Sequence, residues 1–178
     1  MLDWLCSHLA DGLILNVGAG AGYDKRDAKK VLGIDLVIPE TVPSTPFAMA
    51  DATQLPFPDG VFDGAMAKDV IEHTFDPLAI LAEVHRVCRP GGSIVLTVPR
   101  AIPRAVWDDA THVRGFTSRS LSTALTTTGW EVVRGPARIG GFPGAGRLGL
   151  ESRLVELMRI PGFGHWFGTN WFVTARRN

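Results

Sequence analysis

The stretch Leu13–Gly22, LILNVGAGAG, constrains the fold more than any other because it joins a buried-strand pattern directly to a glycine-rich turn. Residues 13–17 form a nearly continuous apolar run, which is typical of a central parallel strand covered on both faces. Three positions that follow have no side chain: Gly18, Gly20 and Gly22. The backbone can turn sharply there, and a ligand can approach the backbone N–H groups. The stretch therefore predicts a loop that binds a nucleotide-type cofactor.

The spacing of these glycines leaves two kinds of loop open. A dinucleotide-binding fingerprint requires G-x-G-x-x-G, and its third glycine would fall on Tyr23, whereas this loop is G-x-G-x-G. Glycine clusters also form ordinary turns, so the loop alone does not determine the function. The features that follow along the chain favour a cofactor site.

Strand and helix patterns alternate along the rest of the chain. Asp76 and Pro77 predict the start of one helix, and Thr117 or Ser118 predicts the cap of another. The first helix has a predicted core-facing stripe formed by Leu78, Leu81, Val84 and Cys88. Apolar segments predict further strands at residues 31–36, 47–50, 61–67, 93–98, 130–133 and 171–175. The alternation predicts an α/β domain with a parallel sheet and right-handed crossovers.

Two of the connections between strands are short. Residues 23–30 leave room for only a short helix, and three prolines exclude a continuous helix before the third strand, at Pro39, Pro43 and Pro46. We therefore expect the first two crossover helices to be shortened, which leaves part of one sheet face without its usual cover.

An acid follows each of two predicted strands. Asp35 ends the segment VLGID, where a carboxylate can accept hydrogen bonds from the hydroxyl groups of a ribose. Asp51 follows residues 47–50, where a carboxylate can accept from the amino group of an adenine ring. For Asp35 the alternative interpretation is a turn residue at the end of a strand.

Composition excludes several classes of protein. The 18 Lys and Arg residues balance the 18 Asp and Glu residues, so no overall basic field is present to hold nucleic acid. No apolar run approaches the roughly 20 residues of a membrane span and no leader pattern is present, so we expect a cytoplasmic protein without membrane contact. Cys6 and Cys88 form no C-x-x-C pair, so neither a disulfide nor a metal site is expected. The length of 178 residues predicts one domain, residues 1–178.

Five segments in a fixed order give the chain a resemblance to a known family. They are LILNVGAGAG, VLGID, ADATQLPFPDGVFD, DVIEHTFDPLAILAEVHRVCRPGG and THVRGFT. In this order and spacing the chain resembles the class I S-adenosylmethionine-dependent methyltransferases over residues 13–133. The resemblance implies a Rossmann-like α/β fold with a seven-stranded, mostly parallel sheet whose last strand is antiparallel. It also implies that S-adenosyl-L-methionine lies across the carboxyl ends of the strands.

The resemblance assigns residues to the methionine end of the cofactor. Gly18, Ala19 and Gly20 would wrap this end, and Gly22 would complete the loop. Asn16 stands where the family usually has an acid. Its contact with the methionine ammonium would be a neutral hydrogen bond, about half as strong as a charge-assisted one. The resemblance therefore implies a weaker hold on this end of the cofactor.

The adenosine end is assigned in the same way. Asp35 would hold the ribose hydroxyls, and Leu36 would flank the adenine. Asp51 would accept from the adenine amino group, while the backbone N–H of Ala52 would donate to a ring nitrogen.

Candidate acceptor-side residues come from two loops. Lys68 and Asp69 follow the fourth predicted strand and match positions that touch the cofactor and face the acceptor, and His73 matches a histidine common in that loop. His112 lies in a later loop on the same rim and is the candidate base, because an imidazole titrates near neutral pH. The predicted catalytic set is therefore His112, Asp69 and His73. For the two histidines the alternative is a structural role in ordering the loops.

The function implied is methyl transfer to an oxygen or nitrogen of a small-molecule acceptor. Positioning alone can lower the barrier by about 7 to 11 kcal/mol, and a base adds a factor of about 10² to 10⁴. One alternative is a nicotinamide-dependent oxidoreductase, which Tyr23 disfavours. The other is a non-catalytic protein that keeps the fold. No residue of the sequence identifies the acceptor.

Residues 135–167 are expected to form an insertion between the last two strands. The segment is rich in glycine and then continues into an amphipathic pattern. We expect it to act as a lid over the acceptor or as the contact of a homodimer, and the alternative is a helix that covers its own core.

Overall fold

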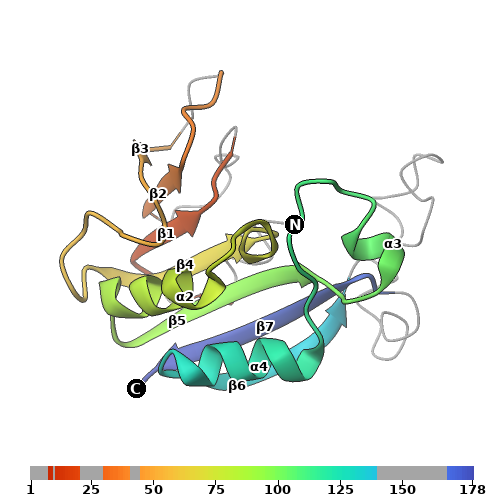
Figure 1. Cartoon of the computed structure of the whole chain (residues 1–178). Coiled ribbons are helices and arrows are strands. Elements are labelled where there is room, and N and C mark those ends of the chain that lie inside the picture. Colours follow the sequence, from red (N-terminus) through yellow and green to blue (C-terminus); the bar gives the residue numbers. More distant parts are fainter. Residues whose placement is uncertain (1–7, 10, 21–29, 41–44, 140–167) are drawn as a thin grey trace, which may run out of the picture.

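The computed structural model describes residues 8–9, 11–20, 30–40, 45–139 and 168–178. They form a seven-stranded sheet with the strand order β3-β2-β1-β4-β5-β7-β6 (Figure 1). The strands are β1 Leu13–Val17, β2 Lys30–Asp35, β3 Phe47–Met49, β4 Phe62–Lys68, β5 Cys88–Pro99, β6 Trp130–Ile139 and β7 Asn170–Arg177.

The strand directions confirm the predicted sheet. β7 runs antiparallel to both of its neighbours, β5 and β6, and every other pair is parallel. From β1 the chain first builds outward through β2 and β3, and then returns to place β4 on the other side of β1. The order therefore reverses between β1 and β4, and open α/β sheets bind ligands at such a switch point.

Both faces of the sheet are covered by apolar side chains, as the continuous apolar run in β1 predicts. Neighbouring residues of β1 point to opposite faces, since Ile14 belongs to the smaller core cluster and Leu15 to the larger one. Both side chains are completely buried. The central strands are therefore fixed in register, because a shift by one residue would exchange the two faces.

In the part of the chain that the structure describes, four helical segments accompany the sheet: η1 Ile71–His73, α2 Pro77–Val87, α3 Pro103–Val106 and α4 Ser118–Thr127. The start of α2 is as predicted, because Asp76 Oδ1 accepts from the N–H of Ala79 at 2.9 Å and Pro77 is the first helical residue. Thr117 caps α4 and exchanges hydrogen bonds with Ser120. None of the described helices is long and apolar enough to cross a membrane.

The inward face of α2 differs from the predicted stripe. Leu78 is 41% exposed, and the buried face is formed by Ile80, Leu81, Val84 and Val87. Cys88 is buried, but it is the first residue of β5. The prediction was wrong for Leu78. Its spacing from Leu81 is compatible with one apolar stripe along a helix, but the sequence does not show which side of that stripe the neighbouring elements cover.

The connection between β2 and β3 has no helix in its described residues, 36–40 and 45–46, in agreement with the predicted shortening. Leu36, Val37 and Ile38 are exposed there. The first shortened crossover, expected at residues 23–30, falls almost entirely on residues 21–29, outside the described residues.

β6 is longer than the sequence predicts. It continues to Ile139 and pairs with β7 up to Asn170. The first five residues of the expected insertion, 135–139, therefore belong to this strand, which is a correction to the lower bound of that segment. Buried and exposed residues do not alternate clearly over residues 135–139, so this part of the strand lacks the pattern by which a strand is predicted from sequence. The rest of the expected insertion, residues 140–167, lies outside the described residues.

Arg177 ties the end of the sheet to the end of α2 and provides a test of this packing. Its Nη1 donates to the carbonyl oxygens of His85 at 2.7 Å and Arg86 at 2.8 Å, in the last turn of the helix. Arg177→Met should lower the free energy of unfolding by about 1.5 to 3 kcal/mol, the range for hydrogen bonds to a charged group. Arg176→Met, at the exposed neighbour in β7, is the control. Equal losses in urea unfolding of the two variants would contradict this role.

Candidate cofactor and acceptor site

A cavity of about 400 Å³ opens at the carboxyl ends of the parallel strands. Residues that follow β1, β2, β3 and β4 line it together with η1 and the start of α2. Seven of its lining residues are predicted site residues: Gly18, Asp35, Leu36, Asp51, Ala52, Asp69 and His73. The fold therefore brings predicted cofactor residues and predicted acceptor residues to one cavity.

The glycine loop bends over the end of β2. Gly18 has a φ of +65°, and a Cβ at this position would lie 2.5 Å from Val70 Cγ2. The N–H of Ala19 donates to the carbonyl of Ile34 at 2.9 Å, and the N–H of Gly20 donates to Asp35 at 2.9 Å. The turn therefore requires glycine at position 18 for both its backbone conformation and its close contact.

Asp35 lies at the cavity, where the sequence predicts it. Its Oδ2 accepts from the N–H of Gly20, and its Oδ1 accepts from the N–H of Leu36 at 2.7 Å. These two hydrogen bonds orient the carboxylate, and each oxygen keeps a second lone pair for a ligand hydroxyl. Leu36 also lines the cavity and is 66% exposed, so it offers apolar surface beside the carboxylate.

Asp51 is held by a residue that the sequence analysis missed. Its Oδ1 accepts from both the N–H and the hydroxyl of Thr53, at 2.8 and 2.7 Å. These hydrogen bonds lower the pKa of Asp51, so its carboxylate stays ionised. Ala52 and Thr53 line the cavity beside it. The D-A-T triplet could have indicated this turn, because aspartate often bonds to the backbone two residues on.

Asp69 has the left-handed backbone conformation, with a φ of +52°. Its Oδ1 accepts from the hydroxyl of Thr97 and from the amide of Asn170, both at 2.9 Å. Lys68 Nζ lies 3.1 Å from its Oδ2. Three neighbours thus fix the carboxylate, and a non-glycine residue in this conformation is typical of functional loops.

Several predicted cofactor residues do not line the cavity. Asn16 is 3% exposed within β1, and Lys68 turns to Asp69. Ala19 and Gly20 form the loop but are not lining residues, and Gly22 lies outside the described residues. Their predicted contacts with a cofactor stay predictions.

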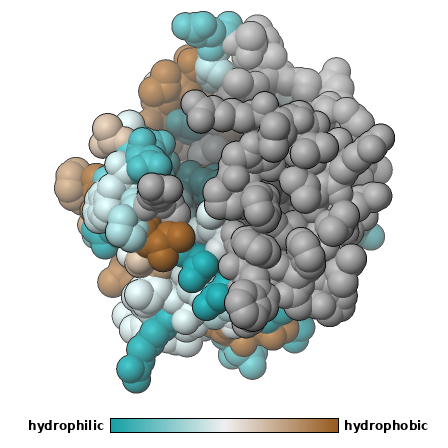
Figure 2. Space-filling view, turned by 90° about the vertical axis from the view of Figure 1, so that its right-hand side faces the viewer, coloured by the Kyte–Doolittle hydropathy of each residue, from teal (hydrophilic) through white to brown (hydrophobic). Residues whose placement is uncertain are grey.

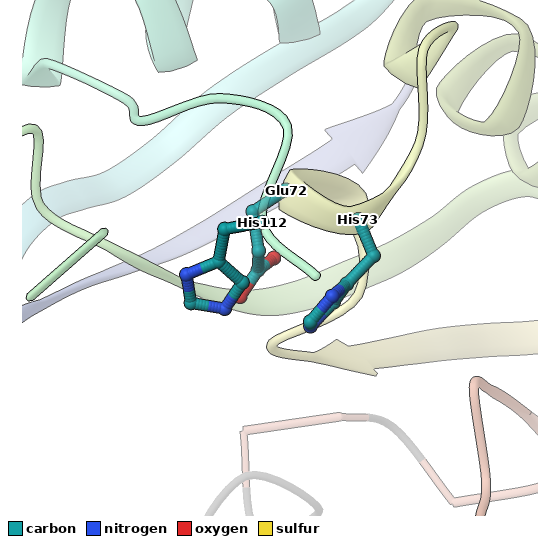
Figure 3. A group of neighbouring side chains, drawn as sticks. All are labelled: Glu72, His73 and His112. Carbon is teal, nitrogen blue, oxygen red and sulfur yellow. The ribbon is translucent and has the colours of Figure 1, made fainter. Parts of the chain in front are cut away.

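His112 is placed against η1 by its own loop. The N–H of Val113 donates to the carbonyl of Glu72 at 2.9 Å, and Arg114 Nη2 donates to the carbonyl of Phe75 at 2.7 Å. As a result, the rings of His112 and His73 lie edge to face with centroids 4.6 Å apart (Figure 3). The two predicted histidines are therefore neighbours, although His112 does not line the cavity itself.

Glu72 is a site residue that the sequence analysis did not single out. It is completely buried, and neither carboxylate oxygen has a hydrogen-bond partner. Burial raises the pKa of Glu72 to about 8. One donor atom each from Glu72, His73 and His112 lie within 4.8 Å of one another, a spacing that could hold a metal ion. An acid next to a histidine in the segment DVIEH was the available signal.

Apolar groups are exposed on the side where the cavity opens. Figure 2 views the molecule from the right-hand side of Figure 1, and its described surface carries hydrophobic and hydrophilic groups next to one another. Large exposed side chains lie just after β2, at the last residue of β3 and just before α2: Leu36, Val37, Ile38, Met49 and Phe75. Leu36 and Phe75 also line the cavity, so a ligand with a flat apolar part would find contact surface there.

The chain is similar in sequence to methyltransferases. Residues 15–96 match a family model described as a methyltransferase domain. A protein of Mycolicibacterium smegmatis, described as a probable S-adenosylmethionine-dependent methyltransferase, is 29% identical over 154 residues, which are 79% of this chain and 59% of the relative. The chain thus spans a little over half the length of that relative.

Solved structures share the fold. The 1,6-didemethyltoxoflavin-N1-methyltransferase of Burkholderia thailandensis, with bound 1,6-didemethyltoxoflavin and S-adenosylhomocysteine, is 20% identical with a TM-score of 0.67, covering 99% of this chain and 76% of that chain. The cyclase SpnF is 22% identical with a TM-score of 0.66, covering 98% of this chain and 79% of that chain. At these identities the likeness establishes the Rossmann-like fold alone.

Glu72→Gln tests the buried carboxyl group. Between the ordinary pKa of 4.5 and about 8, the folded protein keeps a proton that the unfolded chain has lost. The free energy of unfolding therefore falls as the pH rises through this window. Glutamine does not titrate. From pH 5 to 8 the free energy of unfolding of the wild type should therefore fall, relative to that of Glu72→Gln, by on the order of 3 kcal/mol.

Chemical unfolding at several pH values, in the presence of a chelator, measures this difference. Glu131→Gln, at an exposed position of β6, is the control and should follow the wild type. Parallel profiles for the wild type and Glu72→Gln would show that Glu72 is ionised in the folded protein throughout.

Proposed function

We propose that this chain, whose residues 15–96 match a methyltransferase domain, is a class I S-adenosylmethionine-dependent methyltransferase that binds S-adenosylmethionine and transfers the methyl group to an oxygen or nitrogen of a small molecule. The observation that carries the proposal is the single cavity that Asp35 and Asp51 share with Asp69 and His73. Two carboxylates suited to an adenosine and two polar groups suited to an acceptor lie on its wall.

The residues at the cavity fit the cofactor in size and chemistry. Gly18 exposes backbone rather than a side chain, and Asp35 is oriented by two backbone N–H groups while keeping free lone pairs. The carboxylate of Asp51 stays ionised and can accept from an amino group. The exposed side chains of Leu36 and Phe75 offer surface for a flat ring. A cavity of about 400 Å³ is large enough for a ligand of this class.

The chemistry places modest demands on the chain. The sulfonium of the cofactor supplies a methyl group that is already reactive, so the protein mainly has to hold the acceptor in line with it. Well-oriented reactants gain about 7 to 11 kcal/mol from positioning. As the acceptor atom bonds to the methyl carbon, the carbon–sulfur bond breaks and the acceptor loses its proton.

His112 is the residue we propose for the acceptor side, as a base or as a positioning group. Its Nδ1 lies 2.7 Å from the carbonyl oxygen of Val106, and a carbonyl can only accept, so Nδ1 carries the hydrogen. In the neutral ring the lone pair is then on Nε2. His73, whose ring touches that of His112, lines the cavity and continues this polar wall toward the acceptor.

A small acceptor is supported by two observations. The wall of the cavity includes Asp69, Val70 and His73, and its volume of about 400 Å³ is within the range of small-molecule sites. One protein that shares the fold, the 1,6-didemethyltoxoflavin-N1-methyltransferase, was solved with 1,6-didemethyltoxoflavin bound. The predicted homodimer, the cytoplasmic location and the lid role of the segment after β6 stay predictions.

Asp35→Ala tests the cofactor site. Loss of the carboxylate should weaken S-adenosylhomocysteine binding by about 1.5 to 3 kcal/mol, the range for hydrogen bonds to a charged group. Isothermal titration of wild type, Asp35→Ala and the exposed control Glu131→Ala measures it. A parallel titration with NAD should give no binding. Wild-type affinity in folded Asp35→Ala, or binding of NAD in place of S-adenosylhomocysteine, would overturn the assignment.

His112→Ala separates the acceptor side from the cofactor side. Turnover, followed as S-adenosylhomocysteine release with a screen of small hydroxyl and amine acceptors, should fall by about 10² to 10⁴. Affinity for S-adenosylhomocysteine should change little. His85→Ala is the control, because His85 lies on α2 and its ring packs against Trp130 of β6, away from the cavity. Full activity of His112→Ala would leave His112 with only a structural role. A large loss of affinity for S-adenosylhomocysteine would instead make His112 a cofactor-binding residue.

A further inference from the structure

Glu72, His73 and His112 form a cluster that methyl transfer by positioning does not require. Glu72 and His73 come from η1 and His112 comes from the loop after α3 (Figure 3). One donor atom from each lies within 4.8 Å of the others. Two imidazoles and a carboxylate that converge in this way have the composition of a metal site.

Both histidines are held in the form that binds metal ions. His112 Nδ1 donates to the carbonyl of Val106 at 2.7 Å. His73 Nδ1 lies 2.9 Å from the hydroxyl of Thr111 and 3.3 Å from its carbonyl oxygen. That hydroxyl donates to Asp109 Oδ1 at 2.6 Å, so it accepts from His73. Each ring therefore keeps a lone pair on Nε2, and hydrogen bonds of this kind from the other ring nitrogen are typical around metal ligands.

The carboxylate of Glu72 lacks a counter-charge. It is completely buried, and both of its oxygens are without a hydrogen-bond partner. An unpaired carboxylate in such a place requires either a proton or a cation. Two further carboxylates, Asp69 and Asp109, add negative charge in its surroundings, and Lys68 opposes them. The surroundings therefore favour an added positive charge.

We propose that Glu72, His73 and His112 bind one divalent transition-metal ion, with Zn²⁺, Co²⁺, Mn²⁺ or Fe²⁺ preferred over Mg²⁺ and Ca²⁺. The preference follows from the donors, because imidazole suits the former ions, whereas the latter take oxygen ligands. Ligand atoms around zinc lie about 2.0 to 2.2 Å from the ion, so small rotations of the three side chains would complete the site.

This inference deepens the proposed function, and its consequence for catalysis rests on that function. Three protein ligands leave a coordination position open, and His73 borders the cavity. A hydroxyl of the acceptor that occupies this position loses its proton to water more readily, because the ion stabilises the oxyanion. The oxygen then bonds to the methyl carbon while the carbon–sulfur bond breaks. When the metal ion is bound, His112 holds the ion, and the proton of the acceptor goes to water rather than to His112.

The test is metal binding by the whole chain after treatment with a chelator and its removal. Titration with ZnCl2 and CoCl2 should give one equivalent of bound ion, and MgCl2 should bind at least about tenfold more weakly. Glu72→Gln, His73→Asn and His112→Asn should each lower the affinity for Co²⁺ at least about tenfold and alter its visible absorption spectrum. His85→Asn, the control, should bind Co²⁺ as the wild type does. Circular dichroism identifies any variant that does not fold, and the remaining variants then carry the test.

Equal affinity for Co²⁺ in the wild type and in the folded variants, or no binding at all, would overturn the proposal. A separate titration with S-adenosylhomocysteine distinguishes the two inferences. Binding of S-adenosylhomocysteine without metal binding would remove the metal site alone. Binding of Co²⁺ without S-adenosylhomocysteine would keep the metal site and overturn the proposed methyl transfer.

Discussion

The pairing of β1 with a strand on each side determines where the candidate site lies. Val17 pairs with Ile34 of β2 and with Ala67 of β4, so these three parallel strands end at the same edge of the sheet. Residues that are far apart in the chain, such as Gly18 and Asp35, follow these ends and meet at one cavity. The site is thus produced first by backbone hydrogen bonds and two-sided burial, and the functional side chains occupy positions that the sheet creates.

Sequence reasoning located the parts of this site that depend on short-range signals. The helix cap at Asp76 needs only the residues beside it, and the carboxylates of Asp35 and Asp51 need only the end of a buried strand. The parallel sheet then brings such strand ends together without any further information. The seven strands and the antiparallel direction of the last one were predicted from the family resemblance, and the structure confirms both.

Contacts between distant loops were not predictable from the same signals. The approach of His112 to Glu72 depends on the hydrogen bond from Val113 to the carbonyl of Glu72, and on that from Arg114 to the carbonyl of Phe75. Neither contact leaves a periodic pattern in the sequence. The outward side chain of Leu78 has the same origin, because a helix stripe fixes its inner face only when the neighbouring sheet is present.

The segment 69–73 combines two features that oppose folding. Asp69 has a left-handed backbone conformation, which costs on the order of 1 to 3 kcal/mol, and Glu72 buries a carboxyl group without a partner. Among the described residues, Glu72 is the only acid with both oxygens buried and unpaired. Thr97 and Asn170, from β5 and β7, hold Asp69 in place despite this cost. Asp69 lines the cavity, and Glu72 directly precedes His73, which also lines it, so both unfavourable features lie beside the candidate site.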